Sequence, residues 1–327
     1  MRAITRLAVA YACVALAVLV IGAVLPVDDG ALGMLAILAP YFALAVLPLV
    51  PLAVVSRSRV LGLAVAAVAA VFMLRLGGEW WSFPPAPVAD GLRTIDVATW
   101  NIEAGAAPAP TVVAMLNRHP VDIVVLEELT FRAAEAIEAD PAIAARYPHQ
   151  ALFPTRGVTG VGILSAFPLS DTSSAMSPAR FEATIDVDGR RVIVLGAHPF
   201  PAEISLLAGT PVGLKPATRN ADLALVRKRV LELDVQGNDV LLVGDFNTAP
   251  TEPAFERLTA GLHDAHAEVG VGPGWTWRPA PLEFLGTGLL RIDLILSTSA
   301  LLPQRTSIEC PARGDHCLFE ATIALTR

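Results

Sequence analysis

Three uncharged apolar runs at the start of the chain constrain its fold more than any other feature. Leu7–Leu25 is 19 residues long, Ala31–Val55 is a second run, and Val60–Leu74 is a shorter third run that ends at Arg75. A helix needs about 20 apolar residues to cross a bilayer core, so the first two runs are long enough and the third is marginal. We therefore expect residues 1–76 to form a transmembrane anchor. Its expected spans are residues 7–25, 31–55 and 60–76.

The arginine residues around these runs predict the orientation of the anchor. Arg2 and Arg6 precede the first run, and Arg57 and Arg59 separate the second run from the third. Positively charged flanks stay in the cytoplasm, so three spans place the rest of the chain outside it. A cleaved signal peptide is the alternative for the first run. The two further runs, and the turn-like sequence at residues 26–30, favour a multi-pass protein of the cell membrane with an extracytoplasmic domain.

The charge of that domain disfavours duplex DNA as its substrate. The whole chain carries −7, and its first 79 residues hold five Arg against three acidic residues, a balance of +2, which leaves −9 for the remainder. DNA binding depends on Lys and Arg side chains that neutralise phosphates. A divalent metal ion can supply local positive charge, so a nuclease stays open as an alternative.

After the apolar runs, the sequence predicts a linker and one globular domain. Residues 77–92 have the Pro and Gly content of a linker, and short strand-like runs mixed with a few helical patterns fill residues 93–327. The expected strands are residues 94–99, 123–126, 161–164, 181–187, 191–197, 240–243, 292–296 and 317–324, and the expected helices are residues 111–118, 132–138 and 217–233. Such a mixture over about 235 residues predicts an α/β domain of two packed sheets with helices outside.

One predicted strand of this domain ends in a pair of polar side chains. Val240–Val243 is an apolar run of strand length, and Gly244 stops it where the backbone must turn. Asp245 and Asn247 lie two residues apart on the following loop, so both side chains can reach one point above the sheet. A carboxylate there can accept a proton, and an amide can orient a phosphate or a water molecule. The alternative is an ordinary turn, in which Asp and Asn are common.

The string Gly-Asp-Phe-Asn-x-x-Pro at residues 244–250 resembles the signature of the endonuclease/exonuclease/phosphatase superfamily. This superfamily has the fold of DNase I, apurinic endonucleases, neutral sphingomyelinases and inositol-phosphate 5-phosphatases. The resemblance implies a four-layer α/β sandwich, in which two packed, mostly antiparallel sheets are flanked by helices. It also implies a metal-dependent hydrolase of phosphoric esters.

Two motifs near the start of the domain are similar to those of the family. In Trp-Asn-Ile-Glu at residues 100–103, the resemblance implies that Asn101 holds the phosphate and that Glu103 can bind metal. Residues 122–128 are similar to the motif whose final Glu is the main magnesium ligand, which implies that role for Glu128. The family usually has Gln where this chain has Glu127, so a second acidic residue adjoins the implied ligand. Alone, these residues are also typical of turns and of helix starts.

Three later elements complete the resemblance. Gly-Ala-His at residues 196–198 ends a predicted strand, and the family role of His198 is to stabilise or protonate the transferring phosphate. Residues 291–296 resemble the family strand whose Asp, here Asp293, orients the histidine of the final Asp-His pair. That pair is Asp315 and His316, with Asp315 helping to hold the metal or the histidine. A lone His or Asp-His pair is more often structural, and the order of all these motifs carries the resemblance.

The mechanism implied by the resemblance is metal-assisted attack of water on a phosphate ester. Asp245 with His316 activates the water, while Asn101, Asn247 and His198 position the phosphate, and no covalent intermediate is needed. The implied metal ligands are Glu128 with Glu103 or Asp315. This oxygen-rich set favours Mg²⁺ or Mn²⁺ over Zn²⁺.

The membrane anchor narrows the expected substrate. An anchored phosphohydrolase of this kind resembles the actinobacterial membrane proteins of the superfamily that are linked to glycopeptide resistance. That resemblance implies a cell-envelope substrate, such as a lipid phosphate, with membrane lipids as partners and nucleic acid disfavoured. The apolar loop at residues 199–216 could lie against acyl chains or pack on its own domain. An extracellular DNase I-like nuclease and an inactive membrane scaffold are the alternatives, and the full set of acidic residues and histidines speaks against the scaffold.

Two cysteines flank the predicted Asp-His pair. Cys310 and Cys317 lie at the ends of a short loop between two strands, close enough in sequence for a disulfide. An oxidising compartment outside the membrane would allow this bond to persist. Two unpaired buried thiols on facing strands are the alternative. The sequence leaves the substrate head group, the type of phosphate ester and the oligomeric state open.

Overall fold

The computed structural model describes residues 2–82 and 91–326, and these residues form two compact units. The first unit holds the helices that end at Trp80, together with residues 202–217 and 249–257. The second unit holds the remaining described residues. The central part of the predicted linker, residues 83–90, lies outside the described residues.

The predicted membrane anchor is helical, but its second span is broken. The helices are α1 (Arg2–Val24), α2 (Gly30–Leu44), α3 (Leu49–Ser56) and α4 (Arg59–Trp80). By length and composition α1 and α4 can each cross a membrane, and α2 with α3 gives a third span if the pair, bent by 48°, counts as one. The expected span over residues 31–55 therefore consists of two helices in the structure. Pro48 lacks the N–H that would bond to Leu44, which explains the break.

The boundary between anchor and linker also lies later than predicted. The helix α4 continues past residue 76 to Trp80, through Gly77 and Gly78. The Trp80 ring packs edge-on against Phe72, with 5.0 Å between the ring centroids. This contact, about two helical turns back along the same helix, accompanies helix where the two glycines indicated a linker.

Arg75, a charge in an otherwise apolar helix, is held by main-chain carbonyl groups. Its guanidinium donates to the oxygens of Leu19 (3.2 Å) and Gly22 (2.9 Å) near the end of α1, and to the oxygen of Thr251 (3.2 Å). The carbonyl groups at the end of a helix carry partial negative charge. The arginine is therefore compensated within the first unit.

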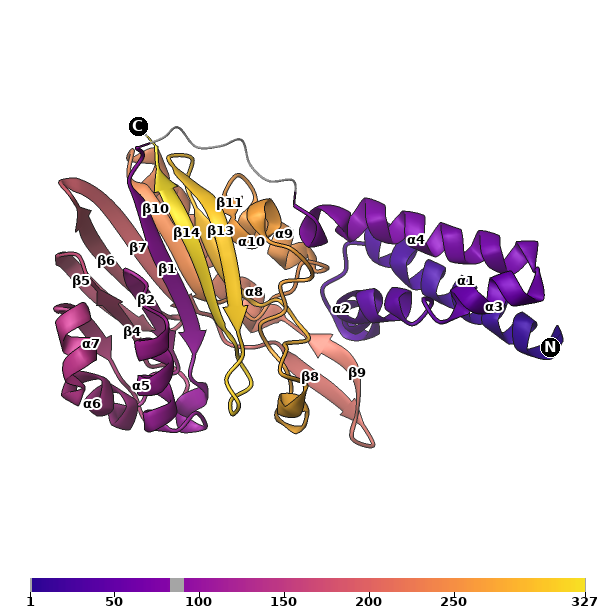
Figure 1. Ribbon diagram of the computed structural model, residues 1–327, viewed down its shortest axis with the longest axis horizontal. Helices are drawn as coiled ribbons and strands as arrows, with labels where there is room; N and C mark the ends of the chain where they lie inside the picture. The colour runs from indigo at the N-terminus through magenta and orange to yellow at the C-terminus, as the bar shows by residue number, and fades with distance from the viewer. Residues whose placement is uncertain (1, 83–90, 327) are drawn as a thin grey trace. The chain divides into compact units, whose positions relative to one another are not determined.

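Two mixed six-stranded sheets form the second unit within the described residues, which confirms the predicted α/β sandwich (Figure 1). The first sheet has the order β13 (Leu301–Glu309), β14 (Leu318–Leu325), β1 (Thr94–Asn101), β2 (Ile123–Glu127), β4 (Val161–Ser165) and β3 (His149–Phe153). The second has the order β11 (His263–Asp264), β12 (Asp293–Ser297), β10 (Asp239–Asp245), β7 (Arg190–His198), β6 (Ala179–Val187) and β5 (Leu169–Met176). The pairs β1–β2 and β7–β10 are parallel, and the other pairs are antiparallel.

The main core lies between the sheets, and helices cover their outer faces. Inward-facing side chains of both sheets, such as Val97, Ile123, Val194 and Val243, form one buried cluster. A second cluster lies between the first sheet and the helices α5 (Ala109–Arg118), α6 (Phe131–Ala139) and α7 (Pro141–Arg146). The long helix α8 (Ala217–Val235) buries its predicted apolar stripe and pairs Arg229 with Glu182 of β6 at 2.7 Å. Two shorter helices, α9 (Pro253–Thr259) and α10 (Ala265–Val269), follow β10 in the chain.

The apolar loop expected at residues 199–216 folds into a hairpin. Its strands are β8 (Glu203–Leu207) and β9 (Thr210–Lys215), which pair with each other as a two-stranded sheet. Residues 202–217 belong to the first unit, with the helices.

Candidate active site

The predicted catalytic residues converge because strand ends from both sheets meet. Asn101 ends β1, Glu128 follows β2, His198 ends β7 and Asp245 ends β10. Since β1–β2 and β7–β10 are parallel pairs, the ends of each pair point the same way. Asp293 begins β12, which runs antiparallel to β10, and it is the direct partner of Asp245 in the ladder.

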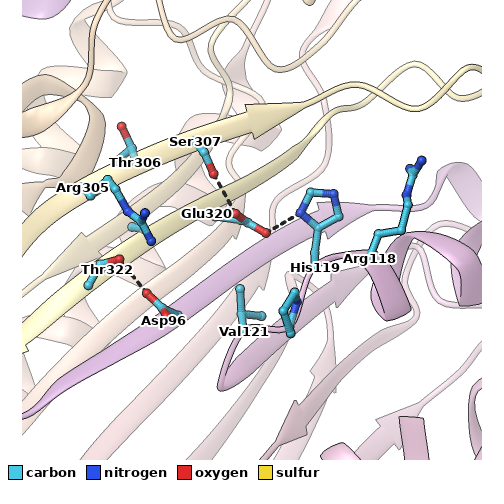
Figure 2. A pocket seen from close by; sticks show the side chains of 11 residues that line it. Asp96, Arg118, His119, Val121, Arg305, Thr306, Ser307, Glu320 and Thr322 are labelled. Atoms are coloured by element: carbon cyan, nitrogen blue, oxygen red, sulfur yellow. Dashed lines mark hydrogen bonds and ion pairs between the residues drawn. The ribbon is translucent and has the colours of Figure 1, made fainter. Parts of the chain in front are cut away.

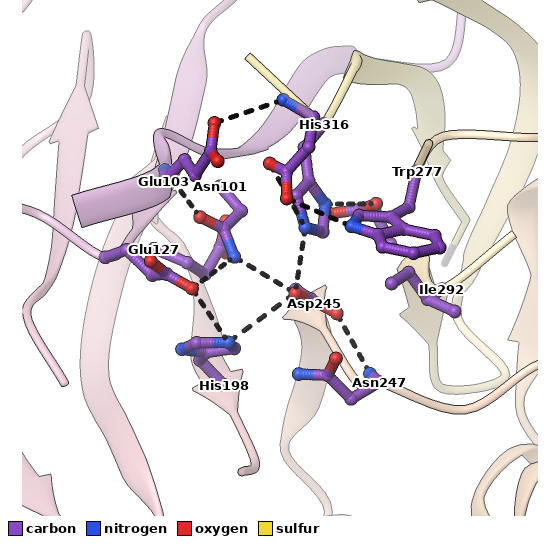
Figure 3. Close-up of polar contacts among 12 residues, drawn as sticks. Asn101, Glu103, Glu127, His198, Asp245, Asn247, Trp277, Ile292 and His316 are labelled. Carbon is purple, nitrogen blue, oxygen red and sulfur yellow. Dashed lines mark hydrogen bonds and ion pairs between the residues drawn. The ribbon is translucent and has the colours of Figure 1, made fainter. Parts of the chain in front are cut away.

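Asp245 lies at the centre of the polar contacts (Figure 3). Its Oδ2 accepts a hydrogen bond from Asn101 Nδ2 at 3.0 Å and lies 3.5 Å from Nε2 of both His198 and His316. Its Oδ1 accepts from the main-chain N–H of Asn247 at 2.9 Å. Burial raises the pKa of Asp245 to about 7, which places its proton exchange near neutral pH.

His316 is oriented by a buried carboxylate. Its Nδ1 lies 3.0 Å from both oxygens of Asp293, so Nδ1 carries a proton and Nε2 faces Asp245. Burial alone would lower the pKa of His316, but the charges of Asp293 and Asp245 outweigh it and raise that pKa to about 10. The imidazole therefore lies between two carboxylates, and the structure brings Asp293 into contact with His316.

His198, at the end of β7, and Asn247, on the loop after β10, border the same centre. His198 Nδ1 lies 3.0 Å from the oxygen of Val158, which leaves Nε2 towards Asp245 and Glu128. Burial lowers the pKa of His198, so its ring is neutral more readily than a free imidazole. The Asn247 amide donates to the oxygen of Pro199 at 3.0 Å, which ties the loop after β10 to the loop after β7.

Asn101 connects the two sides of the site. Its Nδ2 donates to Asp245 and also to Glu128 Oε1 at 3.1 Å, and its Oδ1 accepts from the main-chain N–H of Glu103 at 2.8 Å. In this state the amide that was predicted to hold the phosphate holds two carboxylates. Removing it would take one hydrogen-bond donor from each carboxylate, while Asp245 would keep the main-chain N–H of Asn247.

The predicted metal ligands fall into two places. Glu128 lies beside Asn101, with its Oε1 3.7 Å from His198 Nε2, and burial raises its pKa. Glu103 lies beside Asp315, whose N–H donates to Glu103 Oε2 at 3.3 Å. Burial and then the charge of Asp315 raise the pKa of Glu103.

The donor set of the site fits a divalent cation. Asp245, Asp293 and His316 offer three buried donor atoms within 4.8 Å of one another. The buried Asp315 Oδ1 has no hydrogen-bond partner among the described residues. Carboxylates outnumber the cationic groups around this centre, and an added cation would offset their repulsion.

Two residues with roles at the site were not predicted to have them. The Trp277 indole donates from Nε1 to Asp315 Oδ2 at 3.1 Å, across 38 positions in the sequence. Glu127 is fully buried and accepts from Thr99 Oγ1 at 2.8 Å. Burial, followed by the charge of Asp293, raises the pKa of Glu127 well above its usual range. Its neighbour Glu128 is therefore the more accessible of the two acids.

Gly244 brings the catalytic strands close together. Its φ of +148° is one that L side chains rarely adopt, and a Cβ built there would lie 2.1 Å from the oxygen of Ala197. Ala197 and Gly244 each precede a site residue, His198 and Asp245. The approach of the two strands therefore requires glycine at this position.

The Asp315–His316 segment is closed by a disulfide. Cys310 and Cys317 are bonded, with their α-carbons 4.0 Å apart, which confirms the predicted pairing. The bond closes the loop that carries Asp315 and fixes the residue next to His316. Trp100 Nε1 also donates to the oxygen of His316 at 3.3 Å.

A separate polar hollow lies on the outer face of the first sheet (Figure 2). It has a volume of about 340 Å³, and its lining includes Asp96, His119 and Glu320. The His119 ring lies 2.6 Å from Glu320 and 3.0 Å from Glu309, and Thr322 donates to Asp96. These groups satisfy one another, and none belongs to the predicted motifs, so we do not assign the catalytic site there.

Comparison with known proteins agrees with this geometry. The sequence profile described as the Endonuclease/Exonuclease/phosphatase family matches residues 98–316, and a search of curated proteins gave no match. Among solved structures, truncated Caenorhabditis elegans TDP2 is 18% identical, with a TM-score of 0.55, and the alignment covers 71% of this chain and 98% of that one. The 3′ phosphatase NExo from Neisseria, bound to a product DNA hairpin, is 22% identical, with a TM-score of 0.53 and coverage of 69% and 98%.

A further neighbour is an endonuclease/exonuclease/phosphatase from Beutenbergia cavernae. It is 21% identical, with a TM-score of 0.54, and the alignment covers 72% of each chain. These structures share the fold of the second unit. The profile match extends from β1 to His316 and so includes every motif residue of the site, and the chain therefore belongs to the endonuclease/exonuclease/phosphatase family, hydrolases of phosphoric esters that use a divalent metal ion.

Proposed function

We propose that this protein is a membrane-anchored, extracytoplasmic, Mg²⁺-dependent phosphohydrolase that acts on a lipid-linked phosphate of the cell envelope. The observation that carries the proposal is the presence of apolar helices and a phosphohydrolase site in one chain. The helix α4 ends at Trp80 and β1 begins at Thr94. The segment between them spans at most about 45 Å when fully extended, which keeps the site near the membrane.

The arrangement of the helices in the first unit supports an extracytoplasmic site. Arg2 and Arg6 at the start of α1 line one cavity together with Ser58 and Val60, at the turn between α3 and α4. The bent pair α2–α3 therefore returns the chain to the end of the bundle where α1 begins. Positive charge gathers at that end, with Arg57 and Arg59 adjoining the same turn, and such ends stay in the cytoplasm. Under this arrangement α4 leads out of the cytoplasm.

This orientation is testable independently of catalysis. A reporter enzyme that is active only outside the cytoplasm, fused after the last residue, should be active in cells. Activity of a cytoplasm-specific reporter at the same position would contradict both the orientation and the envelope substrate.

The catalytic proposal assigns a role to each side of the site. We propose that Glu128, with Glu103 or Asp315, would hold Mg²⁺, which would supply positive charge to offset the negative charge of the phosphate. Asp245 Oδ2 takes a proton from the attacking water as the new oxygen–phosphorus bond forms. The ester bond to phosphorus breaks in line, its oxygen takes up a proton from solvent and leaves as the alcohol, and Asp245 returns its proton to solvent. Each turnover consumes one water molecule and leaves no bond between enzyme and substrate.

The remaining side chains position the phosphate and balance its charge. The His316 cation, held by Asp293, offers its Nε2 proton to the negative charge that develops near Asp245. His198 Nε2 lies 3.5 Å from Asp245 Oδ2, and the main-chain N–H of Asn247 donates to Asp245 Oδ1. Asn101 keeps Asp245 and Glu128 apart and oriented.

The net charge of −9 after residue 79 supports a lipid phosphate over a nucleic acid. DNA is the second substrate class to be tested, because NExo and Danio rerio TDP2 are described with bound DNA. A lipid phosphate presents a single phosphate group, and its binding needs no extended basic groove.

The proposal is tested with the full chain in detergent or in vesicles. Its hydrolysis of a polyprenyl pyrophosphate, a lipid phosphodiester, single-stranded DNA and duplex DNA is measured with Mg²⁺ and with a chelator. We expect Mg²⁺-dependent turnover of a lipid phosphate to exceed turnover of DNA. Faster cleavage of DNA, also lost in Asp245→Asn, would replace the proposal by a membrane-anchored nuclease.

A further inference from the structure

The β8–β9 hairpin presents an apolar surface that nothing in its own unit covers. No charged residue lies between Glu203 and Lys215. Its exposed apolar side chains include Ile204, Leu206, Leu207 and Val212, with Leu207 69% exposed. A two-stranded hairpin by itself is marginally stable in water, and exposed leucines at its end add an unfavourable contact with water.

The base of the hairpin is attached to the first turn of α2. Gly30 forms an isolated antiparallel bridge with Leu214, which is buried. A Cβ built on Gly213 would lie 3.3 Å from the main-chain carbon of Gly30, so the two backbones are in close contact. The hairpin and the helices belong to one compact unit. Its position is therefore set by the anchor.

This attachment places the hairpin at the level where α2 begins. Gly30 lies at the end of the bundle away from the cavity lined by Arg2 and Arg6, because α2 and α3 together lead back to that cavity. Arg257 forms an ion pair with Asp28, which lies just before α2 at this end of the bundle. Polar groups next to the start of an apolar helix are typical of the headgroup layer of a membrane.

We infer that the β8–β9 hairpin is an interfacial element, whose apolar end enters the outer boundary between headgroups and acyl chains of the membrane that the helices cross. This inference rests on the membrane anchorage in the proposed function. The Lys215 and Glu203 side chains at the base lie 3.9 Å apart and are largely exposed, so they remain in the headgroup layer. Apolar burial combined with polar flanks is the pattern of elements that lie in a membrane interface.

The inference also narrows the substrate class of the site. The chain passes from His198 through residues 199–202 directly into β8, and Pro199 accepts the hydrogen bond from Asn247. The proposed lipid-contacting hairpin thus follows this site loop directly along the chain. The substrate expected for such a loop is a phosphate located at the membrane surface and attached to a lipid.

The test measures contact between the hairpin and lipid directly. In the full chain with Cys13→Ser, the variant Leu207→Cys is labelled with an environment-sensitive fluorophore without reductant, which preserves the Cys310–Cys317 disulfide. The protein is placed in phosphatidylcholine vesicles that contain lipid spin-labelled near the headgroup. The matched control is Ser174→Cys, on the polar and exposed strand β5. A third variant, Leu63→Cys, reports on α4, where this side chain is 72% exposed.

We expect severalfold stronger quenching by the spin-labelled lipid at position 207 than at position 174, with little quenching by aqueous iodide at position 207. Quenching at position 63 but equal lipid quenching at 207 and 174 would overturn the hairpin inference while the anchor stands. Protection of position 207 from both quenchers would show that protein covers it, which also overturns the inference. Absence of lipid quenching at both 63 and 207 would remove the anchor and the inference together.

Discussion

The two sides of the active site differ in how completely their polar atoms are satisfied. On one side, Asp245, Asp293 and His316 are at most 4% exposed and are linked by short contacts. On the other side, Glu103, Glu128 and Asp315 are only partly buried. Glu103 and Glu128 also adopt positive φ angles of 54° and 55°. The first side is organised before substrate arrives, whereas the second retains carboxylates that a cation would satisfy.

This difference supports the proposed division, in which proton transfer and charge neutralisation belong to separate groups. A fixed hydrogen-bond network holds a base and its cation in place with little reorganisation. Strained backbone and unpaired carboxylate oxygens persist where a bound partner compensates for them. The predictions below are arranged to break or sharpen this division.

The largest effect is expected for Asp245→Asn. The amide keeps the shape of the side chain but cannot take a proton from water, so hydrolysis should fall by about 10³-fold, within the usual range for loss of a general base. The melting temperature should change little, because the contacts with Asn101 and Asn247 can be retained in part. Steady-state rates and thermal unfolding are measured on the same preparation. Near wild-type turnover would remove Asp245 from the proton-handling side.

The next effect distinguishes the two adjacent acids. Glu128→Ala should raise the Mg²⁺ concentration needed for half-maximal activity by at least about 10-fold, since a direct ligand is lost. Glu127→Ala should instead lower the free energy of unfolding by about 1–3 kcal/mol, because it leaves Thr99 without its buried partner. Metal titrations and chemical unfolding of both variants separate these outcomes. Equal changes in Mg²⁺ dependence would contradict the assignment of Glu128.

A pH effect should follow from the proton-handling side in the chelated protein. The pKa of His316 is raised from 6.5 to about 10 by Asp293 and Asp245 against the effect of burial. A raised folded-state pKa stabilises the fold fully below pH 6.5 and loses this contribution as the pH rises through about 10. Melting temperature should therefore decline across this window, and the decline should be shallower in Asp293→Asn. Parallel declines in the two proteins would be evidence against the buried imidazolium.

The smallest effect on hydrolysis is expected for the double variant Cys310→Ser and Cys317→Ser. Opening so short a loop should lower the free energy of unfolding by about 2 kcal/mol, while hydrolysis should fall only severalfold. The reason is that Asp293 and Trp100 still hold His316. Mass mapping of the unreduced wild-type protein is the companion measurement. Free, alkylatable thiols at both positions would contradict the disulfide.

Much of the site could be predicted because its residues follow apolar strands. Asp245 and His198 come at the ends of continuous apolar runs, and their order along the chain matched a known pattern. The roles of Trp277 and Thr99 could not be found in this way, because they depend on contacts between positions that no local pattern relates. The polar strand β5 was missed because its LSDTSSAM sequence lacks apolar alternation.

The helical anchor also has structural features that its sequence alone did not predict. Pro48 was present as a signal for the break in the second span, but uncharged composition alone predicted one helix. Gly77 and Gly78 indicated a linker. The helix α4 nevertheless continues through both residues, and the Trp80 ring packs on Phe72. Arg75 is a charge in an apolar run, and its hydrogen-bond acceptors on α1 could not be identified from the sequence. The break at Pro48 is a local effect of the proline ring, whereas the partners of Arg75 are tertiary contacts that local composition leaves open.

The close approach at Gly244 has a consequence for how the enzyme tolerates random change. Any side chain there must displace the oxygen of Ala197, and that displacement acts on His198 and Asp245 together. A complete library of single substitutions should therefore show position 244 to be as intolerant as position 245, although it contributes no reactive group. Loss of function by this route leaves every catalytic side chain present in the sequence, so an inactive descendant of this protein could retain all its motifs of acids, amides and histidines.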